Sequence, residues 1–214
     1  MGMIPTLGLT IFVGFDLPVE VLKTTGQHLP YRHELFLVFA GLILIIGARR
    51  SVRRWMGMRL VNQVSRFLWN EPMDASRIRQ VNMYLGLEAA MHFIIGVGAY
   101  IITPEAWPVS LVLIALGADH LVFGFYGKRK HKFRVGITKS AVVVADRDVK
   151  VIYYTGLRKV YTHQQSLFFD YIKELQIAIP TGSISTPNRK SFREVLEGNL
   201  DRDRVFFSEG FKEF

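Results

Sequence analysis

The chain has no cysteine among its 214 residues. This absence excludes disulfide bonds, thiolate nucleophiles, iron–sulfur clusters and cysteine-based zinc sites. The sequence also lacks an HExxH pattern and a repeated ExxH pattern, two common ways of placing metal ligands on helices. Residues 1–15 have neither the basic start nor the small-residue cleavage site of a signal peptide. Because no complete catalytic motif is present, we expect a protein that is not an enzyme and that needs no metal or cofactor.

The placement of charge points to a membrane. Half of the residues are hydrophobic, and the formal net charge is +9. The basic residues cluster directly beside apolar runs, which is the pattern of membrane proteins rather than of nucleic-acid-binding surfaces. We therefore expect no nucleic-acid partner, and we expect the flanking basic residues to contact anionic lipid headgroups. These residues are Arg49, Arg50, Arg53, Arg54, Lys128, Arg129, Lys130 and Lys132.

Three apolar runs are long enough to cross a bilayer. They extend over about Tyr31 to Ala48, Val81 to Ile102 and Trp107 to Tyr126, within a membrane region of residues 31–127. The shortest run, at roughly eighteen helical residues, spans about 27 Å. A tight turn at residues 103–106 makes the second and third spans an antiparallel hairpin.

The loops predict the orientation of the spans. Residues 49–80 hold eight arginines against two acidic residues, whereas the turn at residues 103–106 has one glutamate and no basic residue. The positive-inside rule then places residues 49–80 in the cytoplasm. We expect a multi-pass protein of the bacterial inner membrane, with its N-terminus outside and its C-terminal domain inside.

Residues 1–30 are expected to lie outside the cytoplasm or at the membrane interface. The apolar stretch Ile4–Phe15 is too short to cross the bilayer. Pro5, Gly8 and Gly14 argue against a rigid helix there. The sequence leaves open whether this stretch enters the bilayer.

Residues 52–69 repeat apolar side chains at helical spacing, with arginines between them. This pattern predicts an amphipathic helix in the cytoplasmic interface of the membrane. Trp55 and Trp69 suit the level of the headgroups in such a helix.

Four ionisable residues interrupt the second and third spans: Glu88, His92, Asp119 and His120. Exposing such a side chain to lipid costs about 3 kcal/mol, so they should face each other, a partner or water. In an antiparallel hairpin, Glu88 and Asp119 each lie about 10 Å from the same end. Glu88 and His92 share one helix face, while Asp119 and His120 diverge by about 100°. Hydrogen bonding between helices, a docking surface for another membrane subunit, and a metal- or proton-handling site all remain open.

Small residues gather in the same two spans, where they permit close contacts between helices. Because three spans form a thin bundle, we expect a homo-oligomer or a larger membrane complex. The small residues are Gly86, Ala89, Ala90, Gly96, Gly98, Ala99, Gly117, Ala118 and Gly124.

From Phe133 the hydrophobic period changes to two, which predicts β-strands. The expected strands cover about residues 133–137, 141–145, 149–153, 157–161, 167–172 and 175–179. A short helix from Ser191 to about Leu196 follows them. Residues 128–214 are therefore predicted to form a cytoplasmic domain, an antiparallel β-sandwich or barrel closed by one helix.

Residues 132–200 resemble the bacterial PH-like (YcxB-like) domain found on small multi-span membrane proteins. The resemblance implies a pleckstrin-homology-like fold that binds phospholipid headgroups, peptides or neighbouring subunits and has no standard catalytic residues. It rests on Ile137-Thr138, the turn Asp146–Asp148, the stretch Val151–Val160, Phe168-Phe169, Ile177–Ile179 and the helix beginning near Ser191.

The C-terminal segment has more aromatic residues than a solvated tail needs. They are Phe206, Phe207, Phe211 and Phe214. Two expectations stand side by side: these rings pack back on the domain, or they dock against a partner.

We interpret the chain as a non-enzymatic accessory or scaffold subunit of a bacterial inner-membrane complex. It would bind partner proteins, anionic lipid or both through the PH-like domain, and no small-molecule substrate is evident. The alternative is a membrane-embedded enzyme or transporter subunit that handles a metal ion or protons through Glu88, His92, Asp119 and His120.

Overall fold

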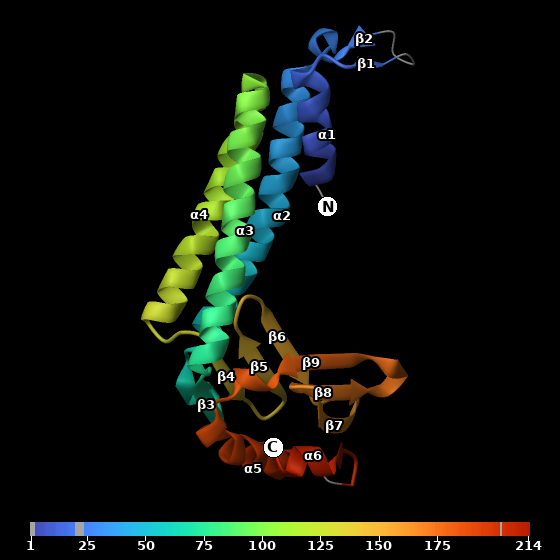
Figure 1. Cartoon of the computed structure of the whole chain (residues 1–214). Coiled ribbons are helices and arrows are strands. Elements are labelled where there is room, and N and C mark those ends of the chain that lie inside the picture. Colours follow the sequence, from blue (N-terminus) through green and yellow to red (C-terminus); the bar gives the residue numbers. More distant parts are fainter. Residues whose placement is uncertain (1–2, 20–23, 202) are drawn as a thin grey trace. The chain divides into compact units, whose positions relative to one another are not determined.

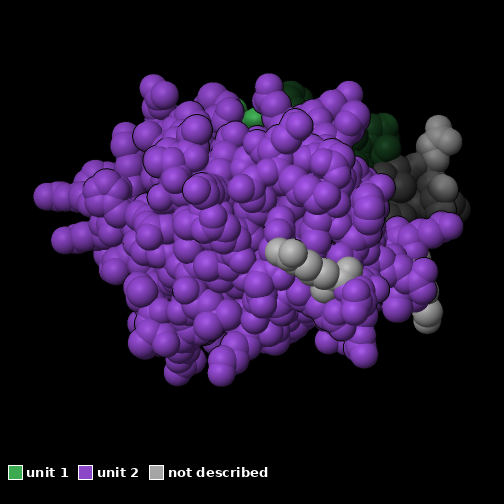
Figure 2. Space-filling view, turned by 90° about the horizontal axis from the view of Figure 1, so that it is seen from below, with its two compact units in different colours: residues 1–52, 84–124 green, residues 53–83, 125–214 purple. Residues whose placement is uncertain are grey.

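The structure, a computed structural model, describes residues 3–19, 24–201 and 203–214. Residues 1–2 and 20–23 of the predicted N-terminal segment, and Arg202 of the tail, lie outside the described residues. The chain forms two compact units, each made of two stretches of sequence (Figure 2). The first comprises residues 1–52 and 84–124, and the second residues 53–83 and 125–214.

Three helices are long and apolar enough to cross a membrane. They are α2 (Arg32–Val61), α3 (Ala75–Ile102) and α4 (Trp107–Arg129), and Figure 1 labels them. Large apolar side chains cover their outer faces: Ile45 is 66 % exposed and Ile94 is 71 % exposed. Such a surface suits lipid, because a protein dissolved in water rarely exposes so many large apolar residues together. The three predicted spans are therefore confirmed as long apolar helices.

The prediction of a separate amphipathic helix at residues 52–69 is wrong. Helix α2 continues without a break to Val61, because arginine, leucine and methionine are good helix formers. After a single 3₁₀ turn at Val64–Arg66, Trp69–Pro72 forms strand β3. Trp69 therefore lies in a sheet, and its indole Nε1 donates a hydrogen bond to Ser191 Oγ at 3.0 Å.

The N-terminal stretch is helical, contrary to expectation. Helix α1 covers Met3–Gly14, and a two-stranded ribbon of β1 (Pro18–Val19) and β2 (Thr24–Thr25) follows it. Pro5 is tolerated because it lies in the first turn, where the main-chain N–H groups have no partner within the helix.

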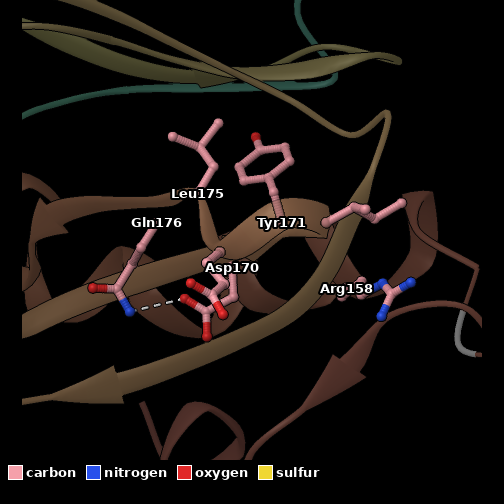
Figure 3. A pocket seen from close by; sticks show the side chains of 7 residues that line it. Arg158, Asp170, Tyr171, Leu175 and Gln176 are labelled. Atoms are coloured by element: carbon pink, nitrogen blue, oxygen red, sulfur yellow. Dashed lines mark hydrogen bonds between the residues drawn. The ribbon is translucent and has the colours of Figure 1, made fainter.

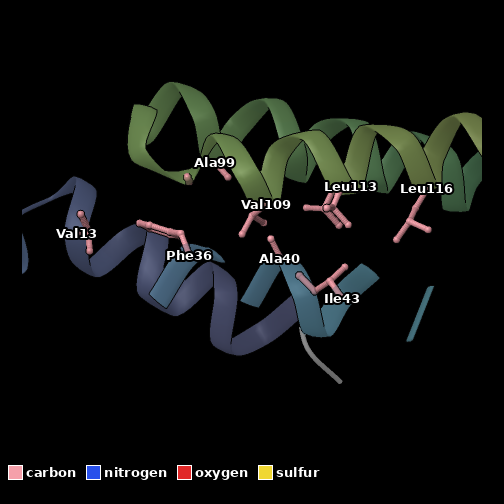
Figure 4. Packing of buried hydrophobic residues seen from close by; sticks show 10 residues of the cluster. Val13, Phe36, Ala40, Ile43, Ala99, Val109, Leu113 and Leu116 are labelled. Atoms are coloured by element: carbon pink, nitrogen blue, oxygen red, sulfur yellow. The ribbon is translucent and has the colours of Figure 1, made fainter. Parts of the chain in front are cut away.

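The core of the first unit lies where α1 meets the three long helices (Figure 4). Phe36 and Val109 are fully buried there, and Val13 from α1 and Ala99 from α3 are almost fully buried. Gly47 of α2 has no room for a side chain, because the Leu116 side chain of α4 occupies that space. This contact fixes which face of α2 turns toward α4.

The second unit contains two four-stranded sheets. In the first, β3 pairs with β4 (Arg134–Ile137), β4 with β5 (Ala141–Ala145), and β5 with β6 (Val149–Tyr153), all antiparallel. In the second, β7 (Leu157–His163), β8 (Ser166–Tyr171) and β9 (Gln176–Pro180) form an antiparallel meander, and β10 (Phe206–Phe207) pairs parallel with β7. The six predicted strands are confirmed, while β3 and β10 were not expected. No closed barrel is seen among the described residues.

Helix α5 (Arg189–Asn199) and the short helix α6 (Glu209–Lys212) complete this unit. Phe207 and Phe211 are buried and stack at 5.4 Å between ring centroids. Phe214 stacks on Phe211 at 6.3 Å and lies under the Arg189 guanidinium. The prediction that Phe207 and Phe211 dock against a partner is wrong, because both rings already pack within the unit. Phe206 alone of the four is largely exposed, at 61 %.

The second unit also contains those ends of the long helices that the sequence predicts to be cytoplasmic. Val61 at the end of α2 packs against Val143 and Ala145 of β5. Arg77, in the first turns of α3, donates a 2.5 Å hydrogen bond to Asp146 in the turn between β5 and β6. The sheets are thus built directly onto the helix ends rather than carried on a free linker.

Candidate functional site

A polar cluster lies between the long helices of the first unit. Glu88 on α3 and His120 on α4 come within 2.9 Å, measured from carboxylate Oε2 to imidazole Nε2. The antiparallel hairpin predicted this pairing, because it places the two residues at similar depth. His120 is 5 % exposed, whereas the Glu88 side chain is 24 % exposed, so the imidazole is the more shielded of the two groups.

Helix α2 adds a third member that the sequence analysis assigned elsewhere. Arg50 Nη2 lies 3.2 Å from Glu88 Oε2 and 3.3 Å from Oε1. Because α2 stays helical beyond the apolar run, Arg50 turns toward α3 rather than ending in the headgroup region. The Glu88 carboxylate therefore joins all three long helices.

The two histidines are held by main-chain carbonyls one turn before them. Nδ1 of His92 lies 2.6 Å from the Glu88 carbonyl oxygen, and Nδ1 of His120 lies 2.6 Å from that of Leu116. The two rings pack with centroids 5.1 Å apart at an angle of 32°. Because a carbonyl oxygen only accepts hydrogen bonds, Nδ1 carries the hydrogen in each ring.

This arrangement brings the Glu88 carboxylate and the His120 imidazole into close polar contact. With Nδ1 already protonated, a neutral His120 presents a lone pair at Nε2. A protonated His120 would form an ion pair with the Glu88 carboxylate at this distance.

Of the four residues predicted in the spans, three meet in this way. Glu88, His92 and His120 form the cluster with Arg50. Asp119 is half-buried and diverges from His120 by about 100° around α4, as consecutive helical residues must. The described residues hold no group of three or more His, Cys, Asp and Glu side chains placed to bind a metal ion.

The residues predicted to contact lipid headgroups have different environments. Arg54 is 1 % exposed and lies among the most buried side chains, so its assignment to headgroups is wrong. Arg53 is 66 % exposed at its side chain and lies 4.0 Å from Asp148. The remaining predicted contacts outside the cluster are exposed or half-buried: Arg49, Lys128, Arg129, Lys130 and Lys132.

No protein-family model, curated protein or solved structure matches the chain.

Proposed function

We propose that the chain is a non-enzymatic accessory or scaffold subunit of a bacterial inner-membrane complex. Its three spans anchor a cytoplasmic binding domain of the bacterial PH-like (YcxB-like) type. Its N-terminus lies outside the cytoplasm. Partner proteins bind this domain, and anionic lipid binds the basic residues at the membrane surface.

The order of the strands supports the PH-like assignment. Strands β3 to β6 form one antiparallel sheet, β7 to β9 form a second, and helix α5 follows them. Successive antiparallel strands followed by one C-terminal helix resemble a PH-like domain. In this chain the hairpin of α3 and α4 is inserted between the first strand, β3, and the second, β4.

This insertion is the observation that carries the proposal. The first strand precedes the hairpin and the other six follow it, so the domain cannot separate from the helix ends without losing a sheet strand. A hydrogen bond between Arg77 and Asp146 connects the same elements, and both side chains are largely buried. A binding domain fixed in this way suits a subunit that holds a partner at the membrane.

The arginine-rich helix ends support the orientation. The second unit contains Arg53, Arg59, Arg77 and Arg79 together with the basic run that closes α4. All of them belong to the end of the helices that bears the sheets, and positive charge favours the cytoplasmic side.

Mild-detergent extraction from native membranes, followed by mass spectrometry of co-purifying proteins and elemental analysis, tests the proposal. We expect stoichiometric partners. Purification as a lone monomer contradicts it, and about one transition metal per chain supports a metal-dependent function instead.

The Glu88–His120 contact favours proton handling as a second candidate function. The pair places an imidazole and a carboxylate 2.9 Å apart between helices, next to the Arg50 guanidinium. Proton flux into liposomes that contain the purified protein tests this function: we expect the wild type to raise the flux and Glu88→Gln to abolish the rise. Equal flux with the wild type and Glu88→Gln contradicts proton handling by this pair.

A further inference from the structure

Two adjoining pockets lie in the second unit, at the turn between β6 and β7. The larger, of about 610 Å³, lies between Lys139, the stretch Tyr154–Arg158 and the segment after α5. The smaller, of about 430 Å³, lies against the end of β8 and the start of β9 (Figure 3). Both are lined by Arg158 and Ile172. We refer to the two pockets together as the distal groove.

The strand directions place the distal groove away from the helix ends. The turn between β5 and β6 contacts α2 and α3, through Asp148 near Arg53 and Asp146 near Arg77. The larger pocket is lined by Lys139, before β5, and Tyr154, after β6, which lie at the opposite ends of these strands. Five extended residues separate the two ends by about 15 Å. The groove therefore lies at the opposite end of strands β5 and β6 from the helix segments that belong to this unit.

The larger pocket has an apolar floor and a cationic rim. Leu157, Leu200 and Val205 are at most 9 % exposed and form the floor. Lys139, Arg158 and Arg204 line the rim, against one carboxylate, Asp201, which lies 3.2 Å from Arg204 Nε.

The Tyr154 phenol adds no negative charge to this lining. Burial raises the pKa of Tyr154, so the side chain stays protonated at neutral pH. Its hydroxyl donates to the Thr138 carbonyl oxygen at 3.3 Å. Among the described residues, the charged groups of the larger pocket are three cations and one carboxylate, and they complement an anion attached to an apolar group.

Among the described residues, the smaller pocket is lined by two carboxylates and by Arg158. Asp170 and Glu174 line it, and Gln176 Nε2 donates to Asp170 Oδ1 at 2.9 Å (Figure 3). Ile172 and Leu175, which also line this pocket, expose about half of their surfaces, at 49 % and 56 %. Two adjoining pockets, one richer in cations and one richer in carboxylates, with exposed apolar side chains, suit an extended chain rather than a small ion.

We propose that the distal groove binds an extended segment of a partner protein, with an acidic residue at Lys139 and Arg158. An apolar residue of the segment lies over Ile172 and Leu175, and a basic residue lies near Asp170 and Glu174. This inference rests on the proposed function as a binding subunit and names the partner's chemistry.

Selection from a random twelve-residue peptide display library tests the groove directly. The target is the full-length protein in discs of neutral phosphatidylcholine, so anionic lipid does not compete. We expect enriched peptides to place an acidic residue beside apolar ones, with a basic residue further along. A synthetic peptide of the enriched sequence should lose about tenfold or more in affinity for the Lys139→Glu/Arg158→Glu variant.

The matched control is Lys190→Glu, a charge reversal on α5 at a side chain that is 78 % exposed and lines neither pocket. It should leave the affinity within about twofold. Arg158→Gln serves as a milder variant if the double charge reversal lowers the melting temperature. The proposal is overturned by a library that yields no binder, by binders that lack acidic residues, by equal effects of the groove and control variants, or by displacement of the peptide with phosphatidylserine vesicles.

Co-purification of the same variants from native membranes separates the two proposals. If the groove variant loses a partner that the wild type and Lys190→Glu retain, the groove is the docking site. If it retains every partner, the groove proposal fails while the subunit proposal stands. If no chain co-purifies even with the wild type, the subunit proposal fails, and the peptide selection decides about the groove.

Discussion

Nε2 of His120 lies 2.9 Å from Oε2 of Glu88, while Arg50 approaches the same carboxylate at 3.2 Å from a third helix. One carboxylate thus connects α2, α3 and α4 at membrane depth. Without it, Arg50 and His120 would face each other with no anion between them. The cluster is complete within one chain, which explains how three spans tolerate these polar residues.

Replacing Glu88 with glutamine tests how much this carboxylate stabilises the helices. The change keeps the shape and removes the charge, so we expect the free energy of unfolding to fall by about 1–2 kcal/mol. Steric trapping in bicelles measures it. The control is Glu105→Gln, because Glu105 pairs with Arg32 at 2.6 Å but both side chains are about one-third exposed. Its loss should stay below about 1 kcal/mol, and equal losses would contradict a special role for the cluster.

The Arg77–Asp146 pair should matter more than the neighbouring Arg53–Asp148 pair. Arg77 and Asp146 are 17 % and 8 % exposed at 2.5 Å, whereas Arg53 is 66 % exposed at 4.0 Å. Removing one partner of a buried pair leaves an uncompensated charge and costs about 3 kcal/mol. We therefore expect Arg77→Met to destabilise the second unit by about that amount and Arg53→Met by less than about 0.5 kcal/mol.

Thermal unfolding followed by circular dichroism at 218 nm, a wavelength typical of strands, measures both variants. The double variant Arg77→Met/Asp146→Leu should recover much of the loss, since two apolar residues replace the buried pair. A double variant as unstable as Arg77→Met alone would show that another contact of Arg77 accounts for the effect.

The strands of the second unit were predictable because their information is local. In β4, β5 and β6 apolar residues recur in short runs, and Asp146–Asp148 provides the turn between two of them. Strand β3 carries no such signal: it has four residues, ends in Pro72, and pairs with β4 more than sixty positions further along the chain. Only the tertiary structure identifies Trp69–Pro72 as a strand.

The polar cluster was predictable in part for a similar reason. Depth along an antiparallel hairpin brings Glu88 near His120, and helix geometry alone provides that depth. Arg50 could not be assigned from the sequence, because an arginine beside a span also suits the headgroups. The packing of Gly47 against Leu116 orients α2 relative to α4, and this orientation determines where Arg50 points. That packing is invisible in the hydrophobic pattern.

Two neighbouring phenylalanines of the aromatic tail differ in burial, so their substitutions test how the tail packs on the second unit. Phe207 is 8 % exposed and stacks on Phe211, while Phe206 is 61 % exposed. We expect Phe207→Ala to lower the free energy of unfolding of the second unit by about 3 kcal/mol through the cavity it leaves. Phe206→Ala should change it by less than about 0.5 kcal/mol. Denaturant titration of the full chain in detergent measures the free energy of unfolding of both variants. A larger loss for Phe206→Ala than for Phe207→Ala would contradict this packing of the tail.

Asp74 immediately precedes α3 and gives the helix a pH-dependent start. Its carboxylate Oδ1 accepts a hydrogen bond from the Ser76 main-chain N–H at 2.8 Å. The hydrogen bond from the Ser76 side chain, followed by this main-chain bond, holds the pKa of Asp74 below its usual range. Because the folded-state pKa is lowered, the stabilisation is present above the unfolded-state pKa and is lost as pH falls through the folded-state value.

At pH 7 we expect Asp74→Ala to weaken the first turn of α3 by about 1 kcal/mol, as loss of an N-terminal cap does. Asp74→Asn keeps an acceptor at this position and should lose only a few tenths of a kcal/mol. Hydrogen exchange of the amides at residues 75–78 measures this local stability. As pH falls below the ordinary aspartate range, the wild type should approach Asp74→Asn, because its carboxyl becomes neutral while the amide does not titrate. A constant difference between wild type and Asp74→Asn down to about pH 2 would show that the charge of Asp74 does not stabilise the helix start.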